Sequence, residues 1–259
     1  MSYMEIVALT AAAAAAGLVN AVAGGGTLIT FPALLAFGTP SIIANATSTL
    51  ALVLGTAGSV YGYRRPIMEV KPWLKRFVPV SLLGGLLGGI LLTITREELF
   101  ARMVPFLLLF ATVLFVAQGA FRRSAGFGQD SGSIVTVHRQ APLAAVIFQF
   151  FVALYGGYFG AGIGILMLAS LGCVGLRDIH QMNGLKTVLG SLINAVAAAY
   201  FIGAGLIHWP KAAVMTLGAL AGYFIGSHFS QQIPQHRVRQ IITAIGFVIS
   251  AVMFYRQFR

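Results

Sequence analysis

The chain has 259 residues, of which 58% are hydrophobic and only 9% are charged, against about 25% charged residues in an ordinary soluble domain. It carries 17 Lys and Arg but only 6 Asp and Glu, which gives a formal charge of +11. From Ile6 to Tyr63, and again from Gln140 to Leu176, there is no Asp, Glu, Lys, Arg or His. As helices rising about 1.5 Å per residue, both runs exceed a hydrocarbon core of about 30 Å. The sequence therefore predicts an all-α, polytopic protein embedded in the lipid bilayer, and excludes a secreted disulfide module, a disordered chain and a nucleic-acid-binding domain.

Charged or Pro-rich breaks divide the chain into apolar blocks. The predicted blocks are 4–37, 42–62, 77–95, 103–119, 140–173, 183–206, 211–230 and 238–255. The first and fifth are too long for one membrane span, and each contains a glycine cluster, Gly24–Gly26 and Gly160–Gly162. Because three consecutive glycines cost roughly 2–3 kcal/mol of helix propensity relative to alanine, each long block is predicted to be a broken helix or a re-entrant hairpin.

Basic residues concentrate in two loops, 63–76 and 120–139. The positive-inside rule predicts that both loops are cytoplasmic. If each long block crosses the membrane once, there are eight spans and both termini are also inside. If each block is a re-entrant hairpin, there are six spans and both termini are outside. The balance of basic residues between the two sides is the same in both cases, so charge does not decide the side of the termini.

Features of the first half recur in the second at a nearly constant offset, as in the pairs Gly24 and Gly160, Gly26 and Gly162, and Asn45 and Asn183. The sequence therefore predicts a first membrane repeat over 1–119, a cytoplasmic linker over 120–139 and a second repeat over 140–259. Two-fold repeats with Gly-interrupted segments in matching positions are typical of secondary transporters with a binding site at the repeat interface.

Glycines four residues apart recur at Gly84/Gly88 and Gly218/Gly222/Gly226. Small residues at this spacing let membrane helices approach closely. Packing within one subunit is the favoured interpretation, and a homo-oligomer interface stays open as the alternative.

The predicted chemistry lies with polar groups inside the apolar blocks, where such groups are costly and must be satisfied. Lys186 is an ionisable residue within the block 183–206, which contains no carboxylate. It attracts an anion if it faces the interior, or extends to the headgroups if the block begins near residue 183. A helix that restarts after a glycine break adds unpaired N–H groups and the positive end of its dipole. The candidate substrate-binding residues are Gly24, Gly25, Gly26, Thr27, Asn45, Thr47, Ser48, Thr49, Gly160, Gly162, Asn183, Lys186 and Thr187.

Enzyme signatures fail on spacing. Lys186-Thr187 lacks the glycines of a phosphate-binding loop, and Ile165 stands where the dinucleotide fingerprint after Gly160 requires glycine. No catalytic residue, metal site or cofactor is predicted, so the driving force is expected to come from gradients.

Several stretches resemble the TauE/SafE family of membrane permeases. The first-half motifs are the segments 20–28 and 44–51, and the second-half motifs are the segments 156–162, 180–187 and 205–210. The resemblance covers nearly the whole chain, and the order of the motifs is that of the family. It implies a permease of the bacterial inner membrane, in a family with members associated with export of sulfite, sulfoacetate and related anions.

The favoured function is thus a secondary transporter, an exporter of small sulfur-containing oxyanions such as sulfite or organosulfonates. The anion is expected near the glycine-broken helix N-termini of both repeats. A passive anion channel and a non-transporting membrane scaffold are the alternatives.

Overall fold

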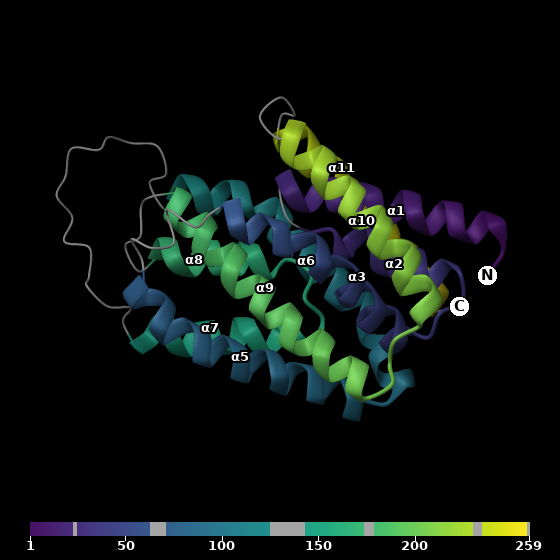
Figure 1. Ribbon diagram of the computed structural model, residues 1–259, viewed down its shortest axis with the longest axis horizontal. Coiled ribbons are helices and arrows are strands. Elements are labelled where there is room, and N and C mark those ends of the chain that lie inside the picture. The colour runs from purple at the N-terminus through teal and green to yellow at the C-terminus, as the bar shows by residue number, and fades with distance from the viewer. Residues whose placement is uncertain (23–24, 63–70, 125–142, 174–178, 230–234, 258–259) are drawn as a thin grey trace.

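The computed structural model describes the chain except for residues 23–24, 63–70, 125–142, 174–178, 230–234 and 258–259. Its described part is all helical, which confirms the predicted fold class (Figure 1). The helices are α1 (Tyr3–Val22), α2 (Thr27–Ala36), α3 (Ser41–Gly62), α5 (Lys71–Ile94), α6 (Glu97–Ser124), α7 (Leu143–Tyr158), α8 (Ile163–Cys173), α9 (Ile179–Gly203), α10 (Trp209–Phe229) and α11 (Gln235–Gln257).

Composition and length agree with a membrane-embedded bundle. Within the described residues, four helical segments are long and apolar enough to cross a bilayer: Tyr3–Ala21, Pro72–Ile94, Glu97–Ala117 and Gln181–Gly203. Large apolar side chains are exposed on the outside of the bundle, among them Ile94, Leu217 and Phe224. A soluble monomer rarely exposes so much apolar surface, whereas lipid tails cover it without cost.

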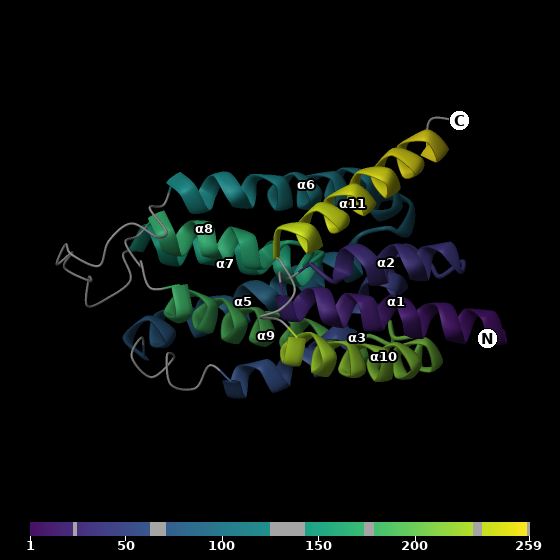
Figure 2. The ribbon, with the colours of Figure 1, turned by 90° about the horizontal axis from the view of Figure 1, so that it is seen from above.

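Each of the two long apolar blocks contains two helices that form a hairpin. Glu5, in the first turn of α1, and Phe37, directly after α2, both contact Lys211, so the first block returns to the end of the bundle where it began. Ala145 of α7 and Leu171 of α8 likewise belong to one buried cluster with Trp73. Figure 2 shows α1 and α2 on one side of the bundle centre and α7 and α8 on the other. Of the two alternatives that the sequence left open, the hairpins are therefore the ones found.

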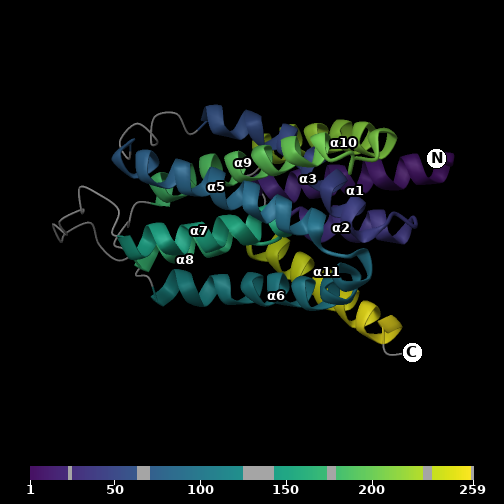
Figure 3. The same ribbon diagram turned by 90° about the horizontal axis from the view of Figure 1, so that it is seen from below.

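The two ends of the bundle differ in what they hold. At the terminal end, α1 begins, α11 ends, and α3, α6 and α10 begin (Figures 2 and 3). At the opposite end, here called the loop end, α3 and α6 end and α5, α7 and α9 begin. Both chain termini therefore lie away from the end where α5 begins and α6 ends.

Two helix boundaries fall inside the predicted basic loops because basic side chains do not end a helix. α5 already begins at Lys71, within the predicted loop 63–76, and α6 continues to Ser124, within the predicted linker 120–139. Long basic side chains reach the interface from helical positions. Residues 63–70 and 125–139 of these two segments lie outside the described residues.

The glycine stripes pack inside the chain, which confirms the favoured interpretation. A Cβ atom on Gly222 of α10 would lie 1.9 Å from the carbonyl oxygen of Ala14 in α1. A Cβ atom on Gly88 of α5 would lie 2.1 Å from the carbonyl oxygen of Leu154 in α7. The backbones of α1 and α10, and of α5 and α7, are thus in direct contact. Each hairpin packs on a helix from the other half of the sequence, as the predicted repeat requires, although the repeat itself stays a prediction.

Candidate anion site

The first glycine break lies between α1 and α2 and is closed by its own side chains. Gly25 has φ of 96°, a left-handed conformation that favours glycine. The Gly26 amide donates to Oδ1 of Asn20 at 2.7 Å, and the Leu28 amide donates to the Gly25 carbonyl at 3.0 Å. Thr27 begins α2 and is half-buried, and its hydroxyl has no partner within the described residues. Gly24 lies outside the described residues.

The predicted hydroxyl and amide cluster on α3 is largely used in internal hydrogen bonds. The Ser48 hydroxyl bonds Oγ1 of Thr30 at 2.6 Å, and Thr30 in turn donates to the Gly26 carbonyl. Oγ1 of Thr47 accepts the His208 amide at 3.1 Å, and Thr49 donates to the carbonyl of Asn45. These hydroxyls therefore join α2, α3 and the start of α10.

Asn45 on α3 connects the first half to the second glycine break. Its Nδ2 donates to the carbonyl of Tyr158 at 3.0 Å, while its Oδ1 is buried without a partner among the described residues. The rings of Phe31 and Phe159 also meet edge to face with centroids 5.4 Å apart. The two breaks are thus neighbours inside the bundle.

The second break lies between α7 and α8 and is more open than the first. Gly160 and Gly162 have φ of 80° and 78°. The Tyr155 hydroxyl fixes the turn by donating to the Ala161 carbonyl at 2.8 Å. The first N–H groups of a helix have no partner within that helix. Here, within the described residues, the amides of Gly162, Ile163 and Gly164 find no acceptor elsewhere.

Lys186 on α9 lies beside the start of α8. A Cβ atom on Gly164 would lie 3.1 Å from Cδ and 3.9 Å from Cε of Lys186, so the lysine stem covers this glycine. Lys186 is half-buried, and within the described part of the chain its ammonium has neither a hydrogen bond nor an ion pair. Its stem therefore packs against α8, and its role toward an anion stays a prediction.

The polar side chains near Lys186 on α9 are also unpaired. Asn183 and Thr187, both half-buried, make no side-chain hydrogen bond with any described residue, and Oγ of Ser191 is buried without one. Asn183, Thr187 and Ser191 are four residues apart, so they lie along one side of α9. The described structure thus places the stem of Lys186 at the start of α8, with three polar side chains that lack a partner among the described residues on the same helix.

Sequence reasoning missed several of the polar residues that shape the site. Asn20 is a polar residue inside an apolar block, and its role as the cap of the first break depends on the hairpin fold. Tyr155 is one more aromatic residue in an apolar stretch and gave no signal. Gln149, another polar group at depth, donates to Oγ of Ser81 and joins α7 to α5. Among the described residues, no group of three or more His, Cys, Asp or Glu could hold a metal ion.

Comparison with known proteins places the chain among membrane transporters. The family model described as "Sulfite exporter TauE/SafE" matches residues 9–253. A "Probable membrane transporter protein" of Haemophilus influenzae is 28% identical over 251 residues, which cover 93% of this chain and 91% of the relative. The "Probable membrane transporter protein ORF9" of a Sinorhizobium species is 26% identical over 93% of this chain and 89% of its own. The "Probable membrane transporter protein YfcA" of Escherichia coli K12 is 24% identical over 93% and 86%. No solved structure matches the chain significantly.

Proposed function

The chain belongs to the sulfite exporter TauE/SafE family of membrane transporters, and we propose that it exports small sulfur-containing oxyanions such as sulfite or organosulfonates. The observation that carries this proposal is the position of Lys186, whose stem packs on Gly164 at the start of α8 and whose ammonium has no partner among the described residues. The proposed site combines Lys186 with Asn183 and Thr187 of α9 and with the amides that follow Gly162.

A bound anion would satisfy groups that are otherwise costly to leave unpaired. Removing a cation from water without a partner carries a penalty of several kcal/mol, and a helix N-terminus attracts negative charge. A sulfite or sulfonate group has three oxygens, which could accept from the ammonium, from the α8 amides and from the Thr187 hydroxyl together. The α9 segment contains no carboxylate that could replace the ligand.

We further propose that the terminal end of the bundle faces outward. The loops 63–76 and 120–139 carry the basic residues and so are assigned to the cytoplasm, which leaves both termini outside a bacterial inner membrane. The two hairpins then enter from opposite sides and bring both glycine breaks to the membrane interior. This arrangement is that of an inverted repeat with the site at its centre.

Flux into proteoliposomes tests the proposal. We expect saturable uptake of radiolabelled sulfite, with counterflow, under imposed pH and voltage gradients. Lys186→Ala is expected to reduce sulfite affinity at least tenfold, and Lys186→Arg, which keeps the charge, to reduce it less. No flux of sulfite, sulfoacetate or sulfate would contradict transport of these anions, and flux without saturation or counterflow would indicate a channel. Unchanged affinity in both Lys186 variants would contradict the site.

A further inference from the structure

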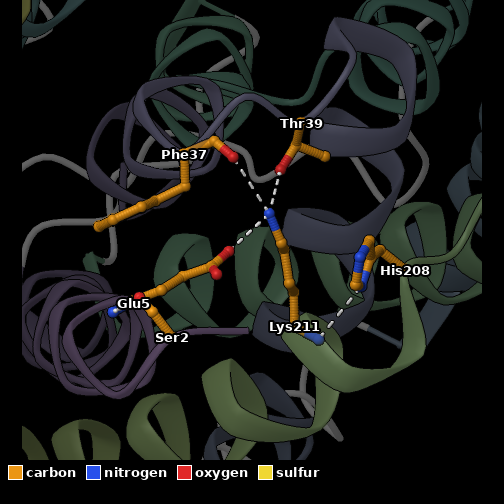
Figure 4. A network of polar contacts seen from close by, with 6 residues as sticks. All are labelled: Ser2, Glu5, Phe37, Thr39, His208 and Lys211. Carbon is orange, nitrogen blue, oxygen red and sulfur yellow. Dashed lines mark hydrogen bonds and ion pairs between the residues drawn. The ribbon is translucent and has the colours of Figure 1, made fainter.

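A buried ion pair joins three segments at the terminal end (Figure 4). Nζ of Lys211, at the start of α10, lies 2.7 Å from Oε1 of Glu5 on α1. The same ammonium donates to Oγ1 of Thr39 at 2.9 Å and to the carbonyl of Phe37 at 3.4 Å, both in the connection between α2 and α3. The two charged side chains are only 8% and 13% exposed. The pair therefore ties the first hairpin, the start of α3 and α10 together through one cation.

Helix stability does not explain this lysine. A cation near the start of α10 opposes the helix dipole, and a buried ion pair is often no more stabilising than apolar residues of similar volume. Toward the loop end, an apolar residue occupies the position that corresponds to Lys211. By the offset of 134 that relates Gly84 of α5 to Gly218 of α10, Lys211 corresponds to Phe77, which is 1% exposed and packs edge to face on Trp73. An ion pair thus holds the helices together at the terminal end, whereas an aromatic contact does so at the corresponding position near the loop end.

Contacts run from the ion pair toward the bundle interior. The Lys211 amide donates to Nδ1 of His208, and the His208 amide donates to Oγ1 of Thr47 on α3. Two residues before Thr47, Asn45 holds the Tyr158 carbonyl next to the second break. If α10 moved away from the start of α3, these contacts would therefore transmit the movement to residues in the middle of the bundle.

We propose that Glu5 and Lys211 form the latch of a gate at the terminal end, which opens when this pair breaks during transport. A transporter with a central site must open its two ends in turn. Once opening lets water reach the pair, water solvates both separated charges and offsets the attraction that is lost. The proposal rests on the transporter family and not on the identity of the anion. It assigns a conformational role to two residues outside the proposed site.

Cysteine accessibility tests the latch. Ala51 on α3 is fully buried and lies one helical turn deeper than Thr47 on the same side of the helix. In a Cys173→Ser, Ala51→Cys protein, we would measure the rate of reaction with a charged, membrane-impermeant methanethiosulfonate in right-side-out and inverted vesicles. With Glu5→Gln, we expect a rate at least tenfold higher from the side of the termini and no increase from the other side.

The control is an exposed ion pair of the same chain. Arg96 and Glu98 approach to 3.6 Å with side chains 85% and 72% exposed, so Glu98→Gln should leave the rate unchanged. If Glu5→Gln fails to insert, the double variant Glu5→Gln, Lys211→Met removes both charges and carries the same expectation. An unchanged rate, an equal increase from both sides, or the same increase with Glu98→Gln would overturn the latch. Because the reaction needs no substrate, these results do not depend on the anion proposal, and an absence of sulfite flux leaves them untouched.

Discussion

Both glycine breaks separate the two helices of a hairpin, but their surroundings differ. At the first break, Asn20 caps the Gly26 amide, and Ser48 and Thr30 use their hydroxyls on each other. At the second break, the offset of 136 that relates Gly26 to Gly162 puts Gly156 in the place of Asn20, and glycine has no side chain to serve as a cap. The offset of 138 that relates Asn45 to Asn183 puts Lys186 in the place of Ser48. The first break therefore uses more of its polar groups in internal hydrogen bonds than the second, which agrees with the anion site proposed at the second break.

The largest expected effect is on the free energy of unfolding, and it differs between the two breaks because they are packed differently. Gly25→Ala should lower the free energy of unfolding in detergent by about 3 kcal/mol or more, from left-handed strain of about 1–2 kcal/mol plus overpacking, because the new Cβ would lie 2.1 Å from Cζ of Phe115. Gly162→Ala should lose only the strain, since its nearest neighbour is 3.6 Å away. Phe115→Ala should relieve part of the Gly25→Ala loss, and equal losses at Gly25 and Gly162 would contradict the difference in packing.

The second prediction separates stability from binding. Ser48→Ala should destabilise the protein by about 1 kcal/mol through loss of a buried hydrogen bond and should change sulfite affinity less than twofold. Lys186→Ala should do the reverse, with at least tenfold weaker binding and no loss of stability, because a half-buried cation without a partner among the described residues is removed. Calorimetric titration and unfolding of the same preparations would measure both. Similar losses of affinity in the two variants would make the breaks functionally alike.

The cap on the first break gives the third prediction. Asn20→Ala should cost about 1 kcal/mol of stability, the usual range for a lost helix cap being about 0.5–2 kcal/mol, and should leave anion affinity unchanged. Asn194→Ala is the control on the second-half side, because the Asn194 side chain makes no hydrogen bond with any described residue. Thermal unfolding of both variants measures the difference, and an equal loss in each would argue against a specific role for the Asn20 cap.

The smallest effect is expected at the two threonines that the offset of 138 relates. The Thr49 hydroxyl donates to the Asn45 carbonyl, whereas the Thr187 hydroxyl is unpaired within the described structure. Thr187→Val should therefore weaken sulfite binding two- to fivefold, about 0.4–1 kcal/mol at 1.4 kcal/mol per tenfold change. Thr49→Val should have no effect on affinity. A loss confined to Thr49→Val would move the site to the first break.

Much of the fold follows from local sequence, because hydropathy and glycine content act locally. The runs around Gly25 and Gly162 predict where a long block is interrupted, and Asn45 and Lys186 stand out as polar groups in apolar surroundings. Whether a block crosses or returns depends on tertiary contacts such as Phe37 with Lys211, and basic-residue counts are the same for either path. The difference between the two breaks could not be predicted from the sequence either, since it depends on the Asn20 side chain accepting a hydrogen bond from the Gly26 amide. No local pattern pairs Glu5 with Lys211, which lie at opposite ends of the sequence.

The contact between α1 and α10 has a consequence for biogenesis. Gly222 of α10 meets the backbone of Ala14 in α1, yet the ribosome completes residues 1–208 before α10 begins. The first hairpin is therefore made long before its main packing partner, with the glycine break between α1 and α2 already in the bilayer. Such a long sequence separation slows native pairing, so the nascent first half must remain in the membrane with an open lateral face. A chain that stops before α10 is expected to leave this hairpin unassembled and to be a substrate for membrane quality control.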